Sequence, residues 1–421
     1  MKLVIFEDDQ FDRFLPLAWV RGVFELRCGA TTLAEKIARA AGRRPDALLL
    51  RDYLVPTARC RAGGAALNDL SACRGEEVLL VNARAGASAF KVPPERGAQW
   101  HGDRLAVWRT TADVGGVRDY AALAAAARRE PRADYAGPWF EYIWDVMLAN
   151  PQEVAADFAA AGRRGIEGQV HPSAVVFGPA DRLYVGPGAE VHPFVCLDTR
   201  NGPVTLEAGV EVHPFTRIEG PCYVGAKSIL LGAKVREGCS IGPMCRVGGE
   251  VEESIIHGHS NKYHDGFLGH AYVGEWVNLG ALTTNSDLKN DYGTVSVLMG
   301  GATIDTGSTK VGAFIGDHVK TSIGTLLNTG TIIGTAAVLV ATGAPLPKYI
   351  PPFAWFLNGM IGKGFGLTPL LKTARTALSR RKVEMTAEDE QLLRTVFERT
   401  AEDREAHVRR ALKTLAQQTK R

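Results

Sequence analysis

A six-residue repeat in the second half of this chain constrains its fold more than any other feature. Many of the repeating aliphatic residues are followed at once by glycine, as in Val185-Gly186. Such a period is typical of a parallel β-helix, in which each repeat forms one face of a triangular coil and the aliphatic side chains stack inside. The longest unbroken series at spacing six consists of Leu206, Val212, Ile218, Val224 and Leu230.

The outer surface of such a coil bears on assembly. The coil hides its aliphatic interior and leaves three flat outer faces, which usually pack against neighbouring subunits in closed oligomers. We therefore expect a homotrimer.

Two stretches, 248–271 and 285–310, depart from the repeat, and we expect loops there. Around the first, residues 251–290 are rich in imidazole, amide and carboxylate groups, and four of the ten histidines fall within fourteen residues. This density is typical of a functional site carried on a rigid scaffold. The polar residues concerned are His257, His259, Asn261, Lys262, His264, Asp265, His270, Asn278 and Asn285.

A metal site is the alternative interpretation of this histidine cluster. The spacings between the four histidines are two, five and six residues, which match no standard zinc signature. No cysteine or paired carboxylate joins them. We therefore favour acid–base or substrate-binding roles for these side chains.

The N-terminal part has the alternation of strands and helices that favours a parallel α/β sheet. A capping box, Thr32 to Glu35, opens a helix that stops at Gly42. We predict an α/β domain over residues 1–165. Its expected strands are 3–6, 47–50 and 78–81, and its later helices are 120–130 and 139–161.

Sheets of this kind bind ligands beyond the carboxyl ends of their strands, so the loop 7–27 is the expected place for a nucleotide. No glycine-rich phosphate loop is present. Arg21 and Lys36 are the candidates for phosphate contacts, and the alternative is that both are solvated surface charges.

After residue 347 the repeat stops, and the apolar segment 350–356 is expected to close the end of the coil, which we assign to 166–347. Thr386 to Asp389 is a capping signature for a helix to about residue 415, so 348–421 form a capping segment and a helical tail. A basic stretch, 372–382, precedes that helix. Nucleic-acid binding there is the minor alternative to a solvated face.

Composition narrows the classes of function. The 49 basic and 46 acidic residues leave a net charge of +3, which is too weak a field to indicate a nucleic-acid partner. No long apolar run predicts a membrane span, and the acidic start MKLVIFEDD is unlike a signal peptide. The seven cysteines form no C-x-x-C pair, so we expect a cytoplasmic protein without a disulfide framework.

Three segments carry a resemblance to a known family. They are LPLAWVRGVFELRCGATTLAEK, GGEVEESIIHGHSNKYHDGFLGHAYVGEWVNLGA and NSDLKNDYG. The coil resembles the left-handed β-helix acyltransferases. Coil and α/β domain together resemble a variant bacterial branch of the bifunctional UDP-N-acetylglucosamine pyrophosphorylase and glucosamine-1-phosphate N-acetyltransferase family. This implies a left-handed coil, acetyl-CoA as acyl donor, Mg²⁺ for nucleotidyl transfer, and a sugar phosphate and a nucleotide as substrates.

The resemblance also nominates residues for acyl transfer. His264-Asp-Gly-Phe267-Leu-Gly matches the family's catalytic segment and implies that His264 is the general base; an imidazole titrates near the working pH. Asp265 or Asn278 would orient the ring or hold the sugar. A histidine that merely caps a turn is the alternative. The residues expected to bind substrate are Asn261, Lys262, Asn285, Lys289 and Arg246.

The chain departs from the family's pattern at several places. Phe267 stands where the family has tyrosine, and Glu252 or Glu253 where it has a phosphate-binding lysine. In the α/β domain, Asn82 occupies the place of a magnesium-binding aspartate and is expected near the nucleotide.

Asp8 and Asp9 are therefore the candidate magnesium ligands of the α/β domain. On the coil, Asp317, His318 and Lys320 are expected to contact coenzyme A, and a solvent-facing coil corner is the alternative for the first two.

Three hypotheses about function follow. The first is a bifunctional sugar-phosphate nucleotidyltransferase and acetyl-CoA-dependent N-acetyltransferase that makes a nucleotide-activated N-acetyl amino sugar. The second is a nucleotidyltransferase whose coil serves oligomerisation alone. The third is a non-catalytic protein that binds sugar nucleotides. The polar density around His264 favours the first.

Overall fold

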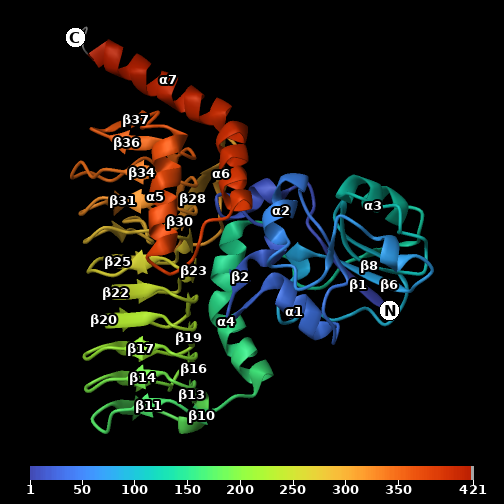
Figure 1. Ribbon diagram of the computed structural model, residues 1–421, viewed down its shortest axis with the longest axis horizontal. Helices are drawn as coiled ribbons and strands as arrows, with labels where there is room; N and C mark the ends of the chain where they lie inside the picture. The colour runs from blue at the N-terminus through green and yellow to red at the C-terminus, as the bar shows by residue number, and fades with distance from the viewer. Residues whose placement is uncertain (419–421) are drawn as a thin grey trace. The chain divides into compact units, whose positions relative to one another are not determined.

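The computed structural model describes residues 1–418, which divide into two compact units, Met1–Asp145 and the residues from Val146 onward. Unit 1 is built on a single twisted sheet, and unit 2 is a tall stack of short strands with helices alongside (Figure 1). Among the described residues, no helix is both long enough and apolar enough to cross a membrane.

The sheet of unit 1 has seven strands in the order β5-β4-β1-β6-β8-β7-β9. The first four are parallel, as predicted, because their connections cross over through helical segments. β8 runs antiparallel to β6 and to β7, so the sheet is mixed. The strands are β1 (Lys2–Phe6), β4 (Ala47–Leu49), β5 (Ala66–Leu67), β6 (Val78–Asn82), β7 (Gly97–His101), β8 (Arg104–Thr110) and β9 (Arg132–Asp134).

The main helices of unit 1 begin where the sequence places their caps. α1 (Leu33–Ala40) starts after Thr32, whose Oγ1 accepts from the Glu35 amide at 3.3 Å while the Glu35 carboxylate accepts from the Thr32 amide at 2.6 Å. α3 (Tyr120–Ala127) starts after Asp119, whose Oδ1 accepts from the Ala122 amide at 2.8 Å. The loop between β1 and α1 is a series of short 3₁₀ turns plus a two-strand ribbon.

Unit 2 is a left-handed parallel β-helix, which confirms the coil predicted from the repeat and the form implied by the family resemblance. Its first face is a ten-stranded parallel sheet. The strands are β10 (Gly165–Ile166), β13 (Leu183–Val185), β16 (Val204–Leu206), β19 (Cys222–Val224), β21 (Cys239–Ile241), β23 (Ile255–Gly258), β26 (Tyr272–Glu275), β30 (Ala313–Ile315), β33 (Thr331–Ile333) and β35 (Tyr349–Ile350).

The second and third faces are shorter strands stacked in the same order. The second face holds β11 (Gln169–Val170), β14 (Glu190–Val191), β17 (Glu211–Val212), the first parts of β20 (Ile229–Val235) and β22 (Arg246–Glu252), β24 (Asn261–Lys262), Asn278, β31 (Lys320–Thr321), β34 (Val338–Leu339) and β36 (Trp355–Leu357). The third face holds β12 (Val175–Phe177), β15 (Cys196–Asp198), β18 (Arg217–Glu219), the second parts of β20 and β22, β25 (Phe267–Gly269), β27 (Thr284–Asn285) and β32 (Leu326–Leu327).

The repeating aliphatic residues fill the interior of the coil, and Val212, Val224 and Leu230 are fully buried. Each such side chain contributes on the order of 1.5–3 kcal/mol by leaving water. The glycines that follow them sit where coils approach closely. A Cβ atom on Gly225 would lie 2.7 Å from the carbonyl carbon of Gly242 one coil above, so the corner has no room for a side chain.

Only one of the two expected loops leaves the coil. Residues 248–271 continue it through β22 to β25, because Val251, Ile256 and Leu268 still point inward and fill the core although their spacing is irregular. Residues 285–310 do leave it, and they carry an antiparallel hairpin of β28 (Ser296–Met299) and β29 (Ala302–Asp305). The coil also continues beyond residue 347, since β35 and β36 pair with the strands below them.

Helices cover parts of two faces of the coil. α4 (Ile143–Ala161) lies along the first face, where the Asn150 amide donates to the Gly238 carbonyl at 2.7 Å and accepts from Ser240 Oγ at 2.9 Å. α5 (Leu367–Ser379), which the sequence analysis missed, packs against the second face. The expected tail helix is two helices, α6 (Ala387–Arg399) and α7 (Ala401–Gln418), which break at Thr400.

Candidate active site

A cleft with a volume of about 600 Å³ opens in unit 1 at the carboxyl ends of β1 and β4. This is where parallel sheets place their ligand sites. Carboxylates and guanidinium groups face each other across it. Its lining consists of Glu7, Asp8, Asp9, Phe11, Leu49, Leu50, Arg51, Asp103, Arg104, Asp119, Tyr120, Ala121, Ala124 and Arg128.

Glu7 fixes Arg51 in the wall of the cleft. The Glu7 side chain is only 3% exposed and accepts from Nε of Arg51 at 2.8 Å and from the Arg51 amide at 2.8 Å. Burial opposes the charge on Arg51, but Glu7 more than offsets it, so the pKa of Arg51 is raised. The guanidinium therefore stays charged at the cleft, stacked over the Phe11 ring at 4.0 Å.

The two candidate magnesium ligands, Asp8 and Asp9, both line the cleft but differ in burial and in their hydrogen-bond partners. Asp8 is buried and accepts from Asn82 Nδ2 at 3.0 Å and from Arg84 Nη1 at 3.1 Å. Asp9 is 65% exposed on the rim, where it pairs with Arg104. Arg104 also lies 3.2 Å from Asp103, so two rim carboxylates share one guanidinium. Asp8 is bonded within a buried network, so it is less accessible to a divalent cation than Asp9 and Asp103 on the rim.

The residues nominated for nucleotide contacts are not brought together at the cleft. Arg21 is 4% exposed and donates to the Leu17 carbonyl at 2.9 Å, and Lys36 is 1% exposed with Nζ 3.4 Å from Ser88 Oγ. Neither lines the cleft. Asn82 is fully buried behind Asp8, where its Oδ1 also accepts from the Arg84 amide at 3.0 Å.

His264 and Asp265 lie exposed at the corner between the second and third faces of the β-helix. The Tyr263 ring lies edge-on to the His264 imidazole at 5.4 Å. Lys262 supports this corner from within, since its Nζ donates to the His264 carbonyl at 2.6 Å and the Gly248 carbonyl at 3.0 Å. Burial lowers the pKa of Lys262 to about 8, although Asp265 acts against that shift.

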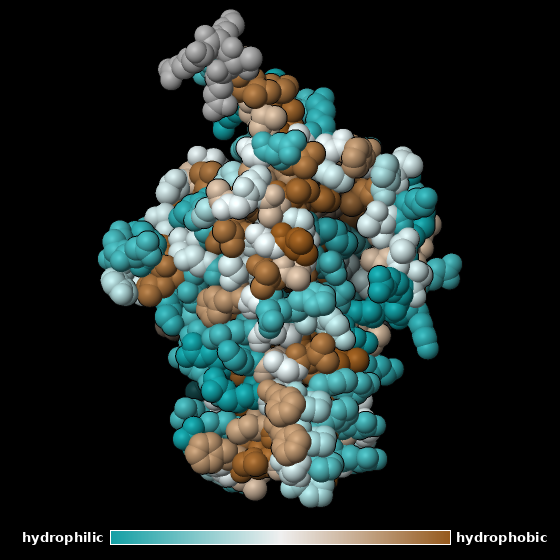
Figure 2. Space-filling model, turned by 90° about the vertical axis from the view of Figure 1, so that its left-hand side faces the viewer, coloured by the Kyte–Doolittle hydropathy of each residue, from teal (hydrophilic) through white to brown (hydrophobic). Residues whose placement is uncertain are grey.

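Large apolar side chains stand on the same corner, above and below His264. The rings of Phe194 and Phe215 are 62% and 75% exposed and stack at 5.7 Å, and Ile323 is 72% exposed. Leu282 packs its backbone directly on Asp265, with its amide 2.8 Å from the Asp265 carbonyl. Figure 2 faces this edge of the coil and shows apolar side chains among polar ones along it.

The other nominated substrate residues divide into two groups. Asn261 and Asn278 lie one above the other on the second face, with Asn261 Nδ2 donating to Asn278 Oδ1 at 3.1 Å. Asn285 is buried and bonds both backbone groups of Gly269 at 2.9 Å, so its amide belongs to the scaffold. Arg246 donates to the Cys245 carbonyl at 2.9 Å, and Lys289 lies 3.2 Å from Asp291 on the inserted segment.

The residues expected to bind coenzyme A are also separated. Asp317 is 1% exposed and accepts from the Glu275 amide at 2.8 Å. His318 occupies a left-handed corner position with φ of 62°. Lys320 instead faces a pocket of about 390 Å³ between the second face and α5, together with Asn261 and Asn278.

Sequence reasoning missed the groups that complete both cavities. Arg51, Arg104 and Arg128 face the cleft of unit 1 from separate segments, so no motif marks them. The basic stretch 372–382 was noted, but its helix was not. α5 and the residues that directly follow it bring Lys372 and Arg381 to the β-helix. The buried residues Leu371, Ala374 and Leu378 recur at the three- and four-residue spacing of a helix, and this pattern could have predicted α5 from the sequence.

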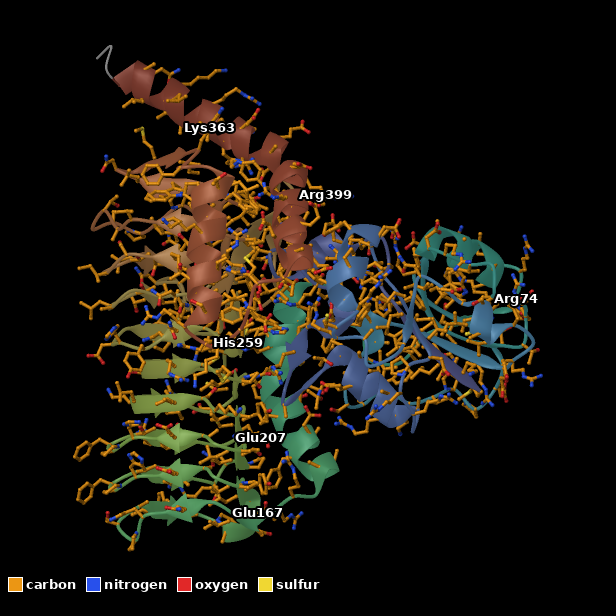
Figure 3. All side chains as sticks on the ribbon, viewed as in Figure 1. Arg74, Glu167, Glu207, His259, Lys363 and Arg399 are labelled. Carbon is orange, nitrogen blue, oxygen red and sulfur yellow. The ribbon has the colours of Figure 1, made fainter. Side chains whose placement is uncertain are left out.

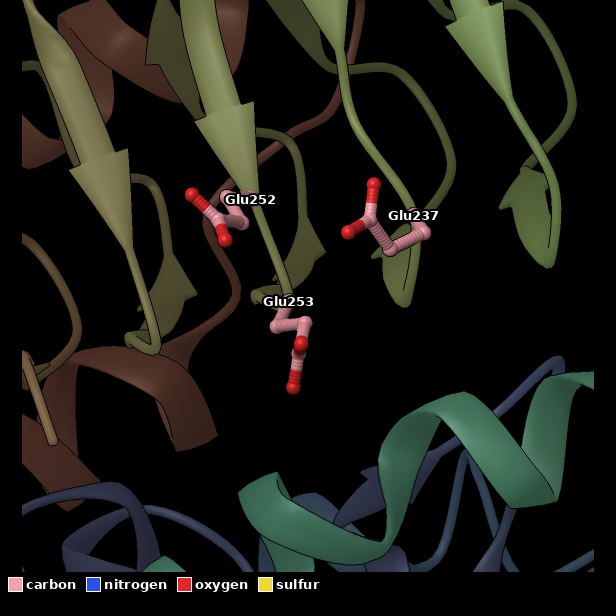
Figure 4. Close-up of side chains that lie close together, drawn as sticks. All are labelled: Glu237, Glu252 and Glu253. Atoms are coloured by element: carbon pink, nitrogen blue, oxygen red, sulfur yellow. The ribbon is translucent and has the colours of Figure 1, made fainter. Parts of the chain in front are cut away.

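A charged network occupies the corner between the third and first faces. Glu237, Glu252 and Glu253 come from successive coils and lie close together (Figure 4). Glu252 accepts from Arg236 Nη1 at 2.6 Å and from Lys310 Nζ at 3.2 Å, so its charge is already compensated. His270 lies between Glu253 and Asp287, as an ion-pair bridge between coils.

Comparisons with known proteins agree with the resemblance predicted from the sequence. Residues 3–164 match the sugar nucleotidyl transferase family. The bifunctional sugar-1-phosphate nucleotidylyltransferase/acetyltransferase of Sulfurisphaera tokodaii is 40% identical over 88 residues, which are 21% of this chain and 22% of that protein. The bifunctional protein GlmU of Nitratidesulfovibrio vulgaris is 31% identical over 214 residues, which are 45% of this chain and 44% of that protein.

The chain therefore spans less than half the length of these curated relatives. Among solved structures, LpxA from Acinetobacter baumannii aligns at 14% identity over 59% of this chain and 95% of that one. The TM-score of that alignment is 0.25, which is too low to support an argument about the fold.

Proposed function

We propose that this chain, a relative of the bifunctional sugar-1-phosphate nucleotidylyltransferase/acetyltransferases, makes a nucleotide-activated N-acyl amino sugar. Unit 1 would join a sugar phosphate to a nucleotide, and the β-helix would acylate the sugar amine from acyl-coenzyme A. The observation that carries the proposal is the cleft at the carboxyl ends of β1 and β4, where three guanidinium groups and three acidic residues of the first loop line one cavity.

In the nucleotidyl transfer, a phosphate oxygen of the sugar phosphate attacks the α-phosphorus of a nucleoside triphosphate, and pyrophosphate leaves. Arg51, Arg104 and Arg128 are placed to neutralise the charge that builds on the phosphate oxygens. Asp9 and Asp103 would hold Mg²⁺, which would supply positive charge that stabilises the transferring phosphates. Asp8 would act through Arg84 and Asn82, by fixing the loop after β1.

In the acyl transfer, the sugar amine attacks the thioester carbon, the new N–C bond forms, and the C–S bond breaks to release the thiol. His264 is the proposed base that takes the amine proton, because it is the exposed imidazole beside Asp265 at the open corner. Asn261 and Asn278 supply amide groups for sugar hydroxyls from the adjacent face. Lys262 holds the His264 backbone in place.

We also propose a homotrimer. The corner that carries His264 exposes the apolar side chains of Phe194, Phe215 and Ile323 to solvent. Exposed apolar surface of this kind is typical of protein–protein interfaces. Packing against neighbouring subunits would cover these side chains. Light scattering coupled to size-exclusion chromatography tests this, with Phe215→Glu expected to shift mass toward the monomer. A cytoplasmic location remains a prediction from the cysteine pattern.

A nucleotidyltransferase with a purely structural coil is the second candidate, and one observation favours it. His264 lines neither of the two cavities described above. In that case the coil would only assemble subunits, and no thiol would be released.

One preparation assayed in two ways separates these candidates. Pyrophosphate release is measured with UTP and N-acetyl sugar phosphates, and thiol release with acetyl-coenzyme A and amino sugar phosphates. We expect Arg104→Gln to abolish only the first and His264→Ala only the second. His171→Ala, an exposed corner histidine bonded to Ser173, is the matched control and should keep both. Pyrophosphate release without thiol release would select the second candidate.

A further inference from the structure

The pocket between the second face of the β-helix and α5 has two walls of different origin. It encloses about 390 Å³, and His259, labelled in Figure 3, marks its lower end beside the end of α5. The β-helix wall consists of His259, Asn261, Trp276, Val277, Asn278 and Lys320. The helix wall consists of Lys372, Thr373, Thr376, Ala377, Arg380 and Arg381.

The charge on these walls is positive, and the carboxylate nearest to a wall residue is Glu275, 3.5 Å from His259 Nδ1. Lys320, Lys372, Arg380 and Arg381 all line the pocket, and no carboxylate does. Within residues 1–418, none of the four has an ion-pair partner. Arginines outside the pocket behave differently, since Arg375 on α5 and Arg394 on α6 both pair with Glu390. Four unpaired cations around one cavity indicate a site for an anion.

Two of the cations are held in place before any ligand arrives. Lys320 Nζ donates to the Trp276 carbonyl at 2.5 Å. Arg381 Nη2 donates to Asn261 Oδ1 at 2.7 Å, and Asn261 in turn donates to Asn278. The surroundings destabilise the charged form of both side chains. Burial lowers the pKa of Lys320 to about 8, and burial together with Arg246 and Arg380 lowers the pKa of Arg381. A bound anion would relieve both.

A flat aromatic surface adjoins the cations. The Trp276 indole and the His259 imidazole stack with centroids 4.4 Å apart and planes 22° apart. Stacking on aromatic rings is how proteins hold nucleobases without reading their identity. Cations beside such a surface match a ligand that joins a base to phosphates.

We propose that this pocket binds the diphosphate-bearing part of a nucleotide and that α5 supplies half of the site. Coenzyme A and a nucleotide sugar both carry this chemistry, so either is a possible source. The inference concerns binding and holds whether or not either transfer reaction takes place.

Isothermal titration calorimetry on the full chain tests the proposal with five probes: coenzyme A, ADP, UDP, pyrophosphate and orthophosphate. We expect the nucleotides to bind at least ten-fold more tightly than orthophosphate. Lys320→Met and Arg381→Gln should each raise their Kd about ten-fold or more, since each removes a charge-assisted contact. Lys372→Gln, at an exposed helix position, should weaken binding without affecting folding.

Lys382→Gln is the matched control, because Lys382 is exposed next to Arg381 but does not line the pocket. Its Kd should stay within about two-fold of the wild type. Arg104→Gln shows whether a nucleotide also binds in the cleft of unit 1. This variant should weaken binding in that cleft and leave the affinity of the pocket beside α5 unchanged. Tighter binding of coenzyme A than of UDP makes the acyl donor the source, and the reverse makes it the nucleotide sugar. The proposal would be overturned if the three pocket variants bound nucleotides as tightly as the Lys382→Gln control, or if no probe bound to the wild type.

Discussion

Nδ1 of His270 lies 2.8 Å from Oδ2 of Asp287, which joins two coils of the β-helix by an ion pair at a buried imidazole. Nε2 of the same ring lies 3.4 Å from Glu253 on the coil below. Burial opposes the charge on His270, but these two carboxylates outweigh it and raise its pKa to about 9.

This pair predicts a loss of stability in mild alkali. Because the pKa of folded His270 is raised above its ordinary value of 6.5, its contribution is complete below pH 6.5 and is lost as the pH rises to about 9. That contribution is on the order of 3 kcal/mol. The melting temperature of the wild type should fall over this range. His270→Gln should lower it at pH 6 and flatten the dependence, and an unchanged slope in the variant would refute the assignment.

Removing Arg84 should destabilise unit 1 strongly. Its side chain is 1% exposed and bonds Asp8, so Arg84→Met leaves a buried carboxylate without its cation. The expected cost is about 3–5 kcal/mol in the free energy of unfolding. Arg96→Met is the matched control, since that arginine is 62% exposed beside Glu77 and should cost under about 1 kcal/mol. Urea unfolding of both variants, followed by tryptophan fluorescence, measures the difference.

Asn285→Ala should affect stability rather than sugar affinity. The Asn285 amide satisfies both backbone groups of Gly269, so its loss leaves two buried groups unpaired and costs about 1–3 kcal/mol. The KM for sugar should stay within about two-fold of the wild type. A raised KM at unchanged melting temperature would instead return Asn285 to the substrate-binding role that its sequence position suggested.

Gly225→Ala should disrupt the corner between coils. The new methyl group would lie 2.7 Å from backbone atoms of Gly242, which have no freedom to move within the ladder of strands. We expect a loss of at least about 2 kcal/mol. Gly116→Ala, where a methyl group meets open space, serves as the comparison in the same thermal melt. Equal melting temperatures for the two variants would show that the coils can separate.

The β-helix could be predicted from the sequence because its interior requires aliphatic residues at regular positions, whereas the sites could be predicted only in part. Aliphatic residues such as Val212 and Val224 recur because the interior of the coil demands them at every turn. Near Val251 and Leu268 the spacing changes while the interior demand persists, so a coil was mistaken for a loop.

The direction in which a charged side chain points leaves no such periodic trace. Arg21 and Lys36 carry the charges that a phosphate site needs, but the fold buries both. Arg51 and Arg104 reach the cleft because separate strands bring them there. Asn261, Asn278 and Lys320 do share a face of the coil, as the repeat implies, but α5 completes their pocket from a later part of the chain, which the repeat does not indicate.

The uppermost strands decide how long the β-helix can become. β37 (Met360–Gly362) runs antiparallel to β36, and Tyr349 and Phe353 on the last coil contact Asp403 and Phe397 of the C-terminal helices. A parallel coil is otherwise a template that another chain could extend indefinitely. Because β37 reverses the strand direction, it blocks the end of the β-helix against the addition of further parallel strands. The β-helix therefore has a fixed length and does not grow into a fibre.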